Sequence, residues 1–163
     1  MEIQSQYEYK GKTYSAHWVE NDPTLDLGDG NVIHGVHAFC FCGDKIVIVY
    51  NPKKKCWTPP GGAIEPEETY QQAVIREVQE ESNMKVLHQE YIGYQDLTDD
   101  SGRTVRQVRS FCIVEPYSEF VSDPDGDITK IKLIAPEDFR QYVDWGTIGD
   151  EIMKRALELK NGI

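Results

Sequence analysis

Three glutamates in the middle of the chain stand at a spacing that can bind a metal ion. Glu77, Glu80 and Glu81 occupy positions i, i+3 and i+4, so in a helix their carboxylates emerge on one side. Without a positive partner these groups would repel one another. Hard divalent cations prefer oxygen ligands, and the cluster therefore indicates a cation site. The structural alternative is a solvated acidic helix face, which is the usual role of a run of charges.

The segment around these glutamates predicts a helix with an apolar side next to the acidic one. It runs from Gly61 to Met84 and reads GGAIEPEETYQQAVIREVQEESNM. Pro66 suits the first turn of a helix, where its missing N–H costs little. An apolar stripe follows at helical spacing: Tyr70, Ala73, Val74 and Val78. One side of the helix can therefore pack on a core while the neighbouring side holds a metal.

This segment resembles the signature box of the Nudix hydrolases, G-x5-E-x7-R-E-U-x-E-E-x-G-U, in which U is aliphatic. The matching positions are Gly62, Glu68, Arg76, Glu77, Val78, Glu80, Glu81 and Met84. One position departs from the pattern, because Asn83 replaces the late glycine at the end of the helix, where a left-handed conformation is usual. Asparagine is the best non-glycine residue there, so we expect the fold to tolerate it. Glu67 also stands where many relatives carry glycine.

The resemblance implies one domain over residues 1–163 with the Nudix fold, an α/β/α sandwich around a mixed β-sheet. The box helix and a C-terminal helix are expected to pack on this sheet. The hydrophobic pattern agrees, since it predicts strands near 6–10, 13–19, 35–42, 45–50, 85–97, 104–115 and 128–134, and a closing helix over 147–159. At 163 residues the chain is long enough to bury a sizeable core.

By the same resemblance, the box hydrolyses the pyrophosphate bond of a nucleoside diphosphate linked to another moiety, with Mg²⁺ or Mn²⁺ as the implied metal. The implied ligands are the three glutamates and the backbone carbonyl of Gly61. Glu77 or Glu80 is implied as the general base as well. Arg76 is implied to pair with Glu68 and so to orient the ligands.

Relatives use one more acidic residue, just before the last strand, as a metal ligand or base. Asp127 best matches this position, and it is the predicted further ligand. Glu119, Asp123 and Asp125 are the alternatives, and an acid of a solvated loop is an equal one.

Four residues outside the box are candidates for substrate contacts. Lys55 closes the basic loop NPKKK, which could meet phosphates or simply solvent. Trp57 precedes the glycines and is expected to pack against the box, with stacking on a base as the alternative. Arg106 and Arg109 lie an odd number of residues apart in one strand, so they face opposite sides of it. At most one of them can reach a shared pocket, and the other meets solvent or acidic neighbours.

Composition limits the partners. The net charge of −11 argues against binding to nucleic-acid polymers, which needs basic patches. A small nucleotide remains compatible, because a bound metal supplies positive charge. We find no apolar run that predicts a signal peptide or a membrane span, and four cysteines without a C-x-x-C pair predict buried free thiols in the cytoplasm. Many relatives are dimers, so a homodimer is left open.

The box does not define the moiety on the other side of the pyrophosphate. No marker after the box points to ADP-ribose, to dinucleoside polyphosphates or to coenzyme A. We therefore predict nucleoside triphosphates as substrates, damaged nucleotides included, followed by nucleotide sugars. The alternative function is a catalytically silent Nudix domain that binds nucleotides to regulate partners. The intact carboxylates of the box favour the enzyme.

Overall fold

The computed structural model describes residues 1–20, 33–119 and 130–163 of the chain. Within these ranges the strands are β1 (Glu2–Tyr9), β2 (Lys12–Glu20), β3 (Ile33–Cys42), β4 (Lys45–Asn51), β5 (Cys56–Thr58), β6 (Gly61–Ala63), β7 (Met84–Thr98), β8 (Thr104–Pro116) and β9 (Lys130–Ile134). The helical elements are α1 (Tyr70–Ser82), the 3-10 turn η1 (Pro136–Asp138), α2 (Phe139–Tyr142) and α3 (Gly146–Asn161).

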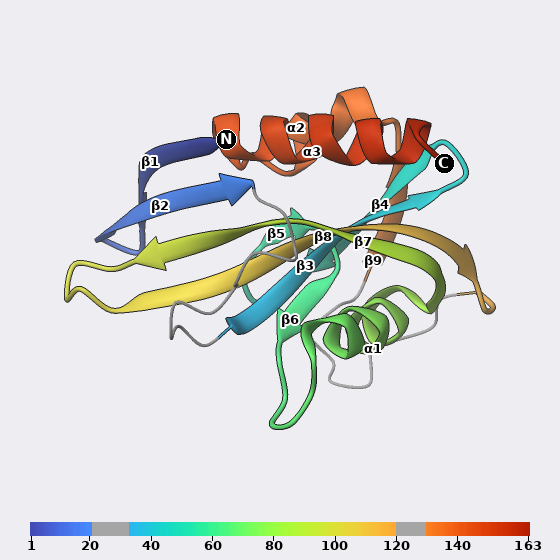
Figure 1. Ribbon diagram of the computed structural model, residues 1–163, viewed down its shortest axis with the longest axis horizontal. Coiled ribbons are helices and arrows are strands. Elements are labelled where there is room, and N and C mark those ends of the chain that lie inside the picture. Colours follow the sequence, from blue (N-terminus) through green and yellow to red (C-terminus); the bar gives the residue numbers. More distant parts are fainter. Residues whose placement is uncertain (21–32, 120–129) are drawn as a thin grey trace.

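The strands form one mixed sheet in the order β1-β2-β7-β8-β3-β4-β5, and β6 and β9 pair with β3 and β4. The central pair, β3 and β8, is parallel, whereas the remaining pairs are antiparallel. Helix α1 covers one face of the sheet, and α2 and α3 cover the other (Figure 1). The predicted α/β/α sandwich is therefore confirmed. None of the helices in the described ranges is long and apolar enough to cross a bilayer.

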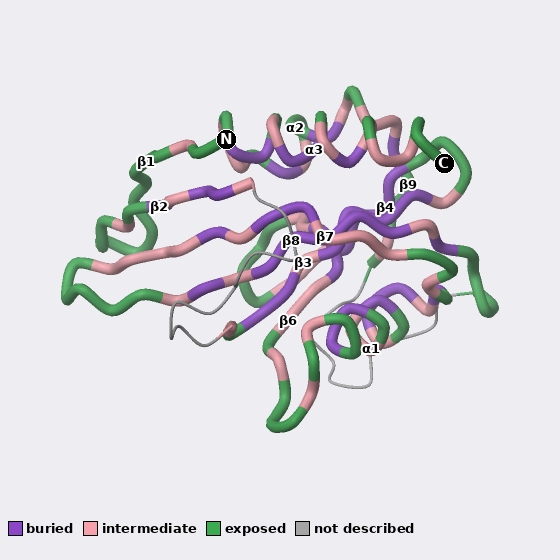
Figure 2. The backbone as a smooth tube through the Cα atoms, viewed as in Figure 1, coloured by how far each residue is buried: buried purple, intermediate pink, exposed green. Residues whose placement is uncertain are grey.

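Each face of the sheet has its own core, because successive side chains of a strand point to opposite faces. On β3, Phe39 and Phe41 join the core beneath α3, while Ala38 and Cys40 join the core beneath α1. The burial pattern follows the layers, since the sides of α1 and α3 that meet the sheet are buried (Figure 2). We call the face of the sheet that α1 covers the box face, and the face that α2 and α3 cover the α3 face.

The box helix begins later than predicted. Thr69 is its N-cap and accepts a hydrogen bond from the backbone N–H of Gln72, whose side chain accepts one from the N–H of Thr69. The helix proper starts at Tyr70, so the placement of Pro66 in its first turn is wrong. Pro66 and Glu67 instead form a turn of the loop between β6 and α1. The capping box explains the difference, because it fixes where the helical hydrogen bonds begin.

The predicted strands are present, and the structure adds two short ones. β5 and β6 were missed because the prolines and glycines around them predict loop. The first strand starts at Glu2, four residues before the predicted start, and the last starts by Lys130, since 128 and 129 lie outside the described residues. The four cysteines are free, but Cys56 is exposed, so the prediction of buried thiols holds for Cys40 and Cys112 and is wrong for Cys56.

Candidate active site

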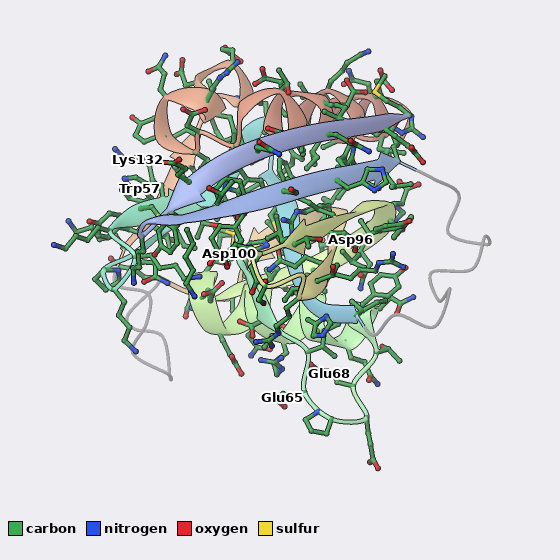
Figure 3. All side chains as sticks on the ribbon, turned by 90° about the vertical axis from the view of Figure 1, so that its left-hand side faces the viewer. Trp57, Glu65, Glu68, Asp96, Asp100 and Lys132 are labelled. Carbon is green, nitrogen blue, oxygen red and sulfur yellow. The ribbon has the colours of Figure 1, made fainter. Side chains whose placement is uncertain are left out.

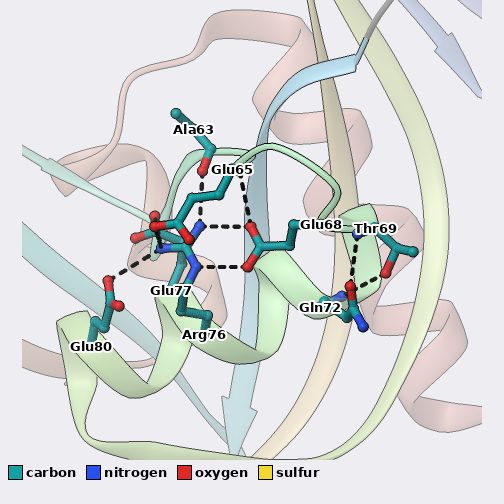
Figure 4. Close-up of polar contacts among 8 residues, drawn as sticks. All are labelled: Ala63, Glu65, Glu68, Thr69, Gln72, Arg76, Glu77 and Glu80. Atoms are coloured by element: carbon teal, nitrogen blue, oxygen red, sulfur yellow. Dashed lines mark hydrogen bonds and ion pairs between the residues drawn. The ribbon is translucent and has the colours of Figure 1, made fainter.

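Arg76 is the centre of the polar contacts on the box helix. Its Nε and Nη2 donate to the two carboxylate oxygens of Glu68, both at 2.8 Å, which confirms the predicted pair. Its Nη1 donates to Glu77 at 2.8 Å and to Glu80 at 3.3 Å (Figure 4). The guanidinium also donates to the backbone carbonyl of Ala63 at 3.0 Å. Arg76 thus connects both ends of the loop between β6 and α1, at Ala63 and Glu68, with two of the three glutamates.

These contacts relieve the repulsion that the sequence predicts. The hydrogen bonds from Arg76 hold the pKa of the Glu68 carboxyl below its usual range. In return, the bonds to Glu68 and Glu77 raise the pKa of the guanidinium above its usual value, so it stays protonated. The family resemblance implied a pair of Arg76 with Glu68 alone, whereas in the structure Arg76 also donates to Glu77 and Glu80.

The two glycines of the box are required by close contacts. A Cβ on Gly61 would run into the carbonyl oxygen of Val36 and lie 2.8 Å from the Cα of His37, so only glycine fits beside β3. A Cβ on Gly62 would lie 2.5 Å from Oε1 of Glu77. Glycine therefore lets the loop backbone approach this carboxylate closely. The N–H of Gly61 donates to Oε1 of Glu81 at 2.7 Å, which joins the loop to the end of the helix.

The donor atoms gathered at this point suit a hard cation. Glu77, Glu80 and Glu81 offer carboxylate oxygens within one helical turn, beside a loop whose backbone carries carbonyls. Glu81 is 8% exposed, so its charge is held in a largely dry position where a cation is favoured. In the described part of the chain, no three acidic, His or Cys side chains are already arranged around a common metal position. The residue types fit a metal, and Arg76 balances two of these carboxylates in the present arrangement.

Helix α1 is flanked by two residues in the left-handed conformation, Glu67 and Asn83. Asn83 has φ 54° and ψ 39°, as predicted for the position of the consensus glycine. Its side chain does what glycine cannot, because Nδ2 donates to the carbonyl and hydroxyl oxygens of Ser118 at 3.0 and 2.7 Å and to the carbonyl of Glu119 at 3.3 Å. Glu67 has φ 67°, in the position where relatives carry glycine. The replacement of the consensus glycine by Asn83 is therefore compensated by the hydrogen bonds of the Asn83 side chain.

Two of the predicted substrate residues lie away from the box helix. Trp57 packs edge-on against Tyr142 of α2 and Tyr50 of β4, and Nζ of Lys132 lies 5.5 Å from its ring centre. In Figure 3, Trp57 and Lys132 lie together beneath the helices of the α3 face, far from Glu65 and Glu68. The expected packing of Trp57 against the box is therefore wrong, since alternation along β5 turns the ring to the other face. Lys55 is exposed in the turn between β4 and β5.

Arg106 and Arg109 lie on opposite faces of the sheet, as their odd spacing predicts. Arg106 belongs to the box face, where its Nε and Nη2 donate to the two carboxylate oxygens of Asp96, both at 2.8 Å. Its guanidinium carbon lies 3.9 Å from the ring centre of Tyr94. This is the acidic neighbour expected for one of the two arginines.

Arg109 belongs to the α3 face and lies in a different environment. Its Nη1 donates to Nδ1 of His37 at 2.9 Å, and its Nη2 donates to Oε1 of Gln95 at 3.0 Å and of Gln107 at 2.9 Å. The guanidinium lies 4.8 Å from the ring centre of Trp145. Burial lowers the pKa of Arg109 to about 9. Burial and the charge of Arg109 also hold the pKa of His37 well below its usual range, so the imidazole is neutral.

Sequence analysis did not select the four neighbours of Arg109. A signal was available for two of them, because Gln95 and Gln107, like Arg109, are polar residues at inward positions of strands that otherwise carry mainly apolar residues there. They are direct partners in the β7–β8 register, which the sequence alone does not give. His37 and Trp145 reach the same point from β3 and from the start of α3, and only the fold brings them there.

The predicted additional acid cannot be placed. Asp127 and two of its alternatives, Asp123 and Asp125, lie outside the described residues. Glu119 is described, and its backbone carbonyl is held by Asn83 at the C-terminal end of the box helix. The role of a fourth acid therefore stays a prediction.

A comparison with known proteins finds a family model that covers most of the chain. Residues 34–156 match the family model of the NUDIX domain. The chain is similar in structure to the pyrophosphohydrolase BsRppH of Bacillus subtilis, with a TM-score of 0.70, 19% identity and 97% of each chain covered. It is also similar to a MutT protein of Bacillus halodurans, with a TM-score of 0.59, 19% identity, and 76% of this chain and 80% of that one covered.

A third similar structure is the NUDIX domain of NrtR from Shewanella oneidensis, in complex with ADP ribose. Its TM-score is 0.61 at 19% identity, with 85% of this chain and 92% of that one covered. No curated protein in the comparison matches the chain. Because the family model spans most of the chain and the box residues meet at one site, the chain belongs to the Nudix family. The similar solved structures, at 19% identity, show the fold that the chain shares with them.

Proposed function

We propose that the chain, as one domain over residues 1–163, hydrolyses the pyrophosphate bond of a nucleoside diphosphate linked to another moiety and depends on Mg²⁺ or Mn²⁺ to do so. Nucleoside triphosphates, damaged nucleotides included, are the substrates we expect first, and nucleotide sugars second. The observation that carries this proposal is the hydrogen bond from the N–H of Gly61 to Glu81. It brings the glycine loop and the last glutamates of the helix to one point.

Each residue of the box has a role in this proposal. Glu77, Glu80 and Glu81, with the carbonyl of Gly61, would hold the metal. When bound, the metal neutralises phosphate charge and makes a bound water more acidic. Glu77 or Glu80 accepts the proton of the attacking water. Arg76 keeps these carboxylates in place through its bonds to Glu68 and is a positioning residue.

Residues outside the box extend the proposal to the substrate. We assign substrate binding to Arg109, whose guanidinium is bound by neutral side chains. Arg106 is the weaker candidate, because Asp96 already takes both ends of its fork. Lys55 is kept as a phosphate contact, since it is exposed and cationic. The small, acidic chain is expected to act in the cytoplasm on free nucleotides.

The test is a panel of nucleoside triphosphates, nucleotide sugars and ADP-ribose, read by the release of phosphate or nucleotide with and without Mg²⁺ or Mn²⁺. We expect turnover of at least one substrate that stops when the metal is chelated. Binding of nucleotides without turnover at any metal concentration would favour the regulatory alternative. The similarity to the NrtR domain, which was crystallised with ADP ribose, is the reason for including ADP-ribose in the panel.

A further inference from the structure

The strongest unexplained feature outside the box is the buried guanidinium of Arg109. The residue is 3% exposed, and no carboxylate among the described residues pairs with it. Its Nε is buried and has no hydrogen-bond partner in the described part of the chain. A buried cation without an anionic partner costs stability, so its presence in an acidic chain needs a reason.

The hydrogen bonds around Arg109 use up acceptors and leave donors. Arginine can only donate, so the atoms that face it must be the acceptors of His37, Gln95 and Gln107. Each glutamine thereby turns its carbonyl oxygen toward the guanidinium and its NH₂ group away from it. The polar groups that remain for a ligand are donors, namely N–H groups of the two amides and of Arg109 and the Nε2–H of His37. We call this arrangement the donor seat.

The donor seat adjoins the box on one side and an aromatic ring on the other. His37 pairs with Gly61 in the β3–β6 register, and a Cβ on Gly61 would lie 2.8 Å from the His37 ring. The ring of Trp145 lies edge-on to His37, with 5.2 Å between ring centres. Gln107, His37 and Trp145 are half-buried, so the seat is reached from the surface at these residues. The backbone of Gly61 therefore links the seat to the box loop, where the phosphate of a nucleotide would bind.

We propose that Arg109, Gln95 and Gln107 form the seat of the nucleobase and select a purine with a carbonyl oxygen at position 6 over one with an amino group. This inference rests on the proposed function in one respect, namely that the substrate is a nucleotide. A 6-oxo purine presents two neighbouring acceptors, O6 and N7, whereas a 6-amino purine places a donor beside N7. The N–H of the 6-amino group would face N–H donors of the seat, so both the amino group and one donor of the seat would lack an acceptor.

Inosine and adenosine monophosphate isolate this difference, because they differ at position 6 and in the protonation of N1. The experiment measures their dissociation constants for the metal-free protein by calorimetry, so no turnover is needed. We expect inosine monophosphate to bind at least about tenfold tighter. Inorganic phosphate is the third ligand and should compete only weakly.

Two variants test the assignment to the seat. Arg109→Met keeps an unbranched side chain but removes the guanidinium and its donors, and we expect the two affinities to become equal. Gln107→Glu leaves the guanidinium in place but gives it a carboxylate partner inside the protein, so the preference should fall by a similar factor. Gln71→Glu is the matched control, because it adds the same charge at an exposed position of α1 on the other face. It should keep the preference of the wild type.

The outcomes are distinct. Equal affinities in the wild type, or a preference that survives in both seat variants, would overturn the proposal, and so would inorganic phosphate that competes as strongly as inosine monophosphate. A protein that hydrolyses nucleotides without this preference would keep the proposed function and lose the seat. A protein that shows the preference but turns over no nucleotide would keep the seat and lose the proposed function.

Discussion

The two faces of the sheet each bury an arginine from β8, and the two arginines are treated differently. On the box face, Arg106 donates through both sides of its fork to Asp96 and lies over Tyr94. On the α3 face, Arg109 lies among an imidazole and two amides, which are neutral. The two residues are both 3% exposed, so burial does not distinguish them.

The difference indicates which of the two is structural. A buried ion pair satisfies both partners, and its removal leaves one of them uncompensated. A buried cation that is held only by neutral acceptors lowers the stability of the fold. Its charge is not neutralised inside the protein and is available to a ligand. Perturbed groups of this kind concentrate at functional sites. In the proposed function, the box face carries the chemistry and the α3 face carries the selection of the base.

The largest effect is expected on turnover, when a glutamate of the box face is replaced. Glu81→Gln keeps the shape of the side chain and can still accept from the N–H of Gly61, but it removes a charge. Turnover should fall by about 100-fold or more, while the affinity for inosine monophosphate without metal stays within about twofold. Steady-state kinetics and calorimetry measure the two quantities.

Glu90→Gln is the control for Glu81→Gln, because it removes the same charge at a half-buried position of β7, outside the box helix. Its turnover should equal that of the wild type. Wild-type turnover by Glu81→Gln itself would contradict the assignment of Glu81 as a ligand.

The two arginines can be compared directly by removing each one. Arg106→Met leaves the carboxylate of Asp96 without its partner and should lower the free energy of unfolding by about 2 kcal/mol. Arg109→Met removes a charge that has no anionic partner among the described residues, so stability should stay the same or rise. Urea unfolding of both variants measures the difference. Equal losses in the two variants would show that Arg109 is as structural as Arg106, and the comparison would fail.

A smaller contrast exists within the box itself, between its two left-handed residues. Asn83→Gly keeps the conformation but loses the bonds from the side chain to Ser118 and Glu119, so we expect a loss of about 1 kcal/mol. Glu67→Gly relieves an unfavourable φ in an exposed turn and should gain about 0.5 kcal/mol. Thermal unfolding should move in opposite directions. A gain in Asn83→Gly would mean that the bonds of its side chain add nothing.

The smallest effect concerns His37, which makes the stability of the protein depend on pH through the α3 face. Its pKa in the folded protein is lowered by burial and by Arg109, so the folded state resists protonation. The unfolded chain binds this proton below about pH 6.5, and the contribution to stability is therefore lost as the pH falls below that value. In Arg109→Met the pKa of His37 should rise toward its usual value and the loss should shrink. An NMR titration of His37 in both proteins decides this, and an unchanged titration would contradict it.

The sequence by itself determined the box and the alternation of the strands. The spacing of Arg76, Glu77, Glu80 and Glu81 needs nothing but helical geometry, whereas the pair of Arg76 with Glu68 was implied by the family resemblance. The opposite facing of Arg106 and Arg109 followed from the period of a strand. These predictions succeeded because they depend on residues close together in the chain. The start of the helix was misplaced because the capping box of Thr69 outweighed the preference of Pro66.

The tertiary structure alone decided what surrounds each arginine. Asp96 and Gln95 are neighbours in β7, yet one pairs with Arg106 and the other with Arg109, since the register of β7 against β8 sets both contacts. Trp145 arrives from the start of α3, and Trp57 turns away from the box for the same kind of reason. Contacts between distant segments depend on register and packing, and these are energies of the whole fold that no local pattern of residues contains.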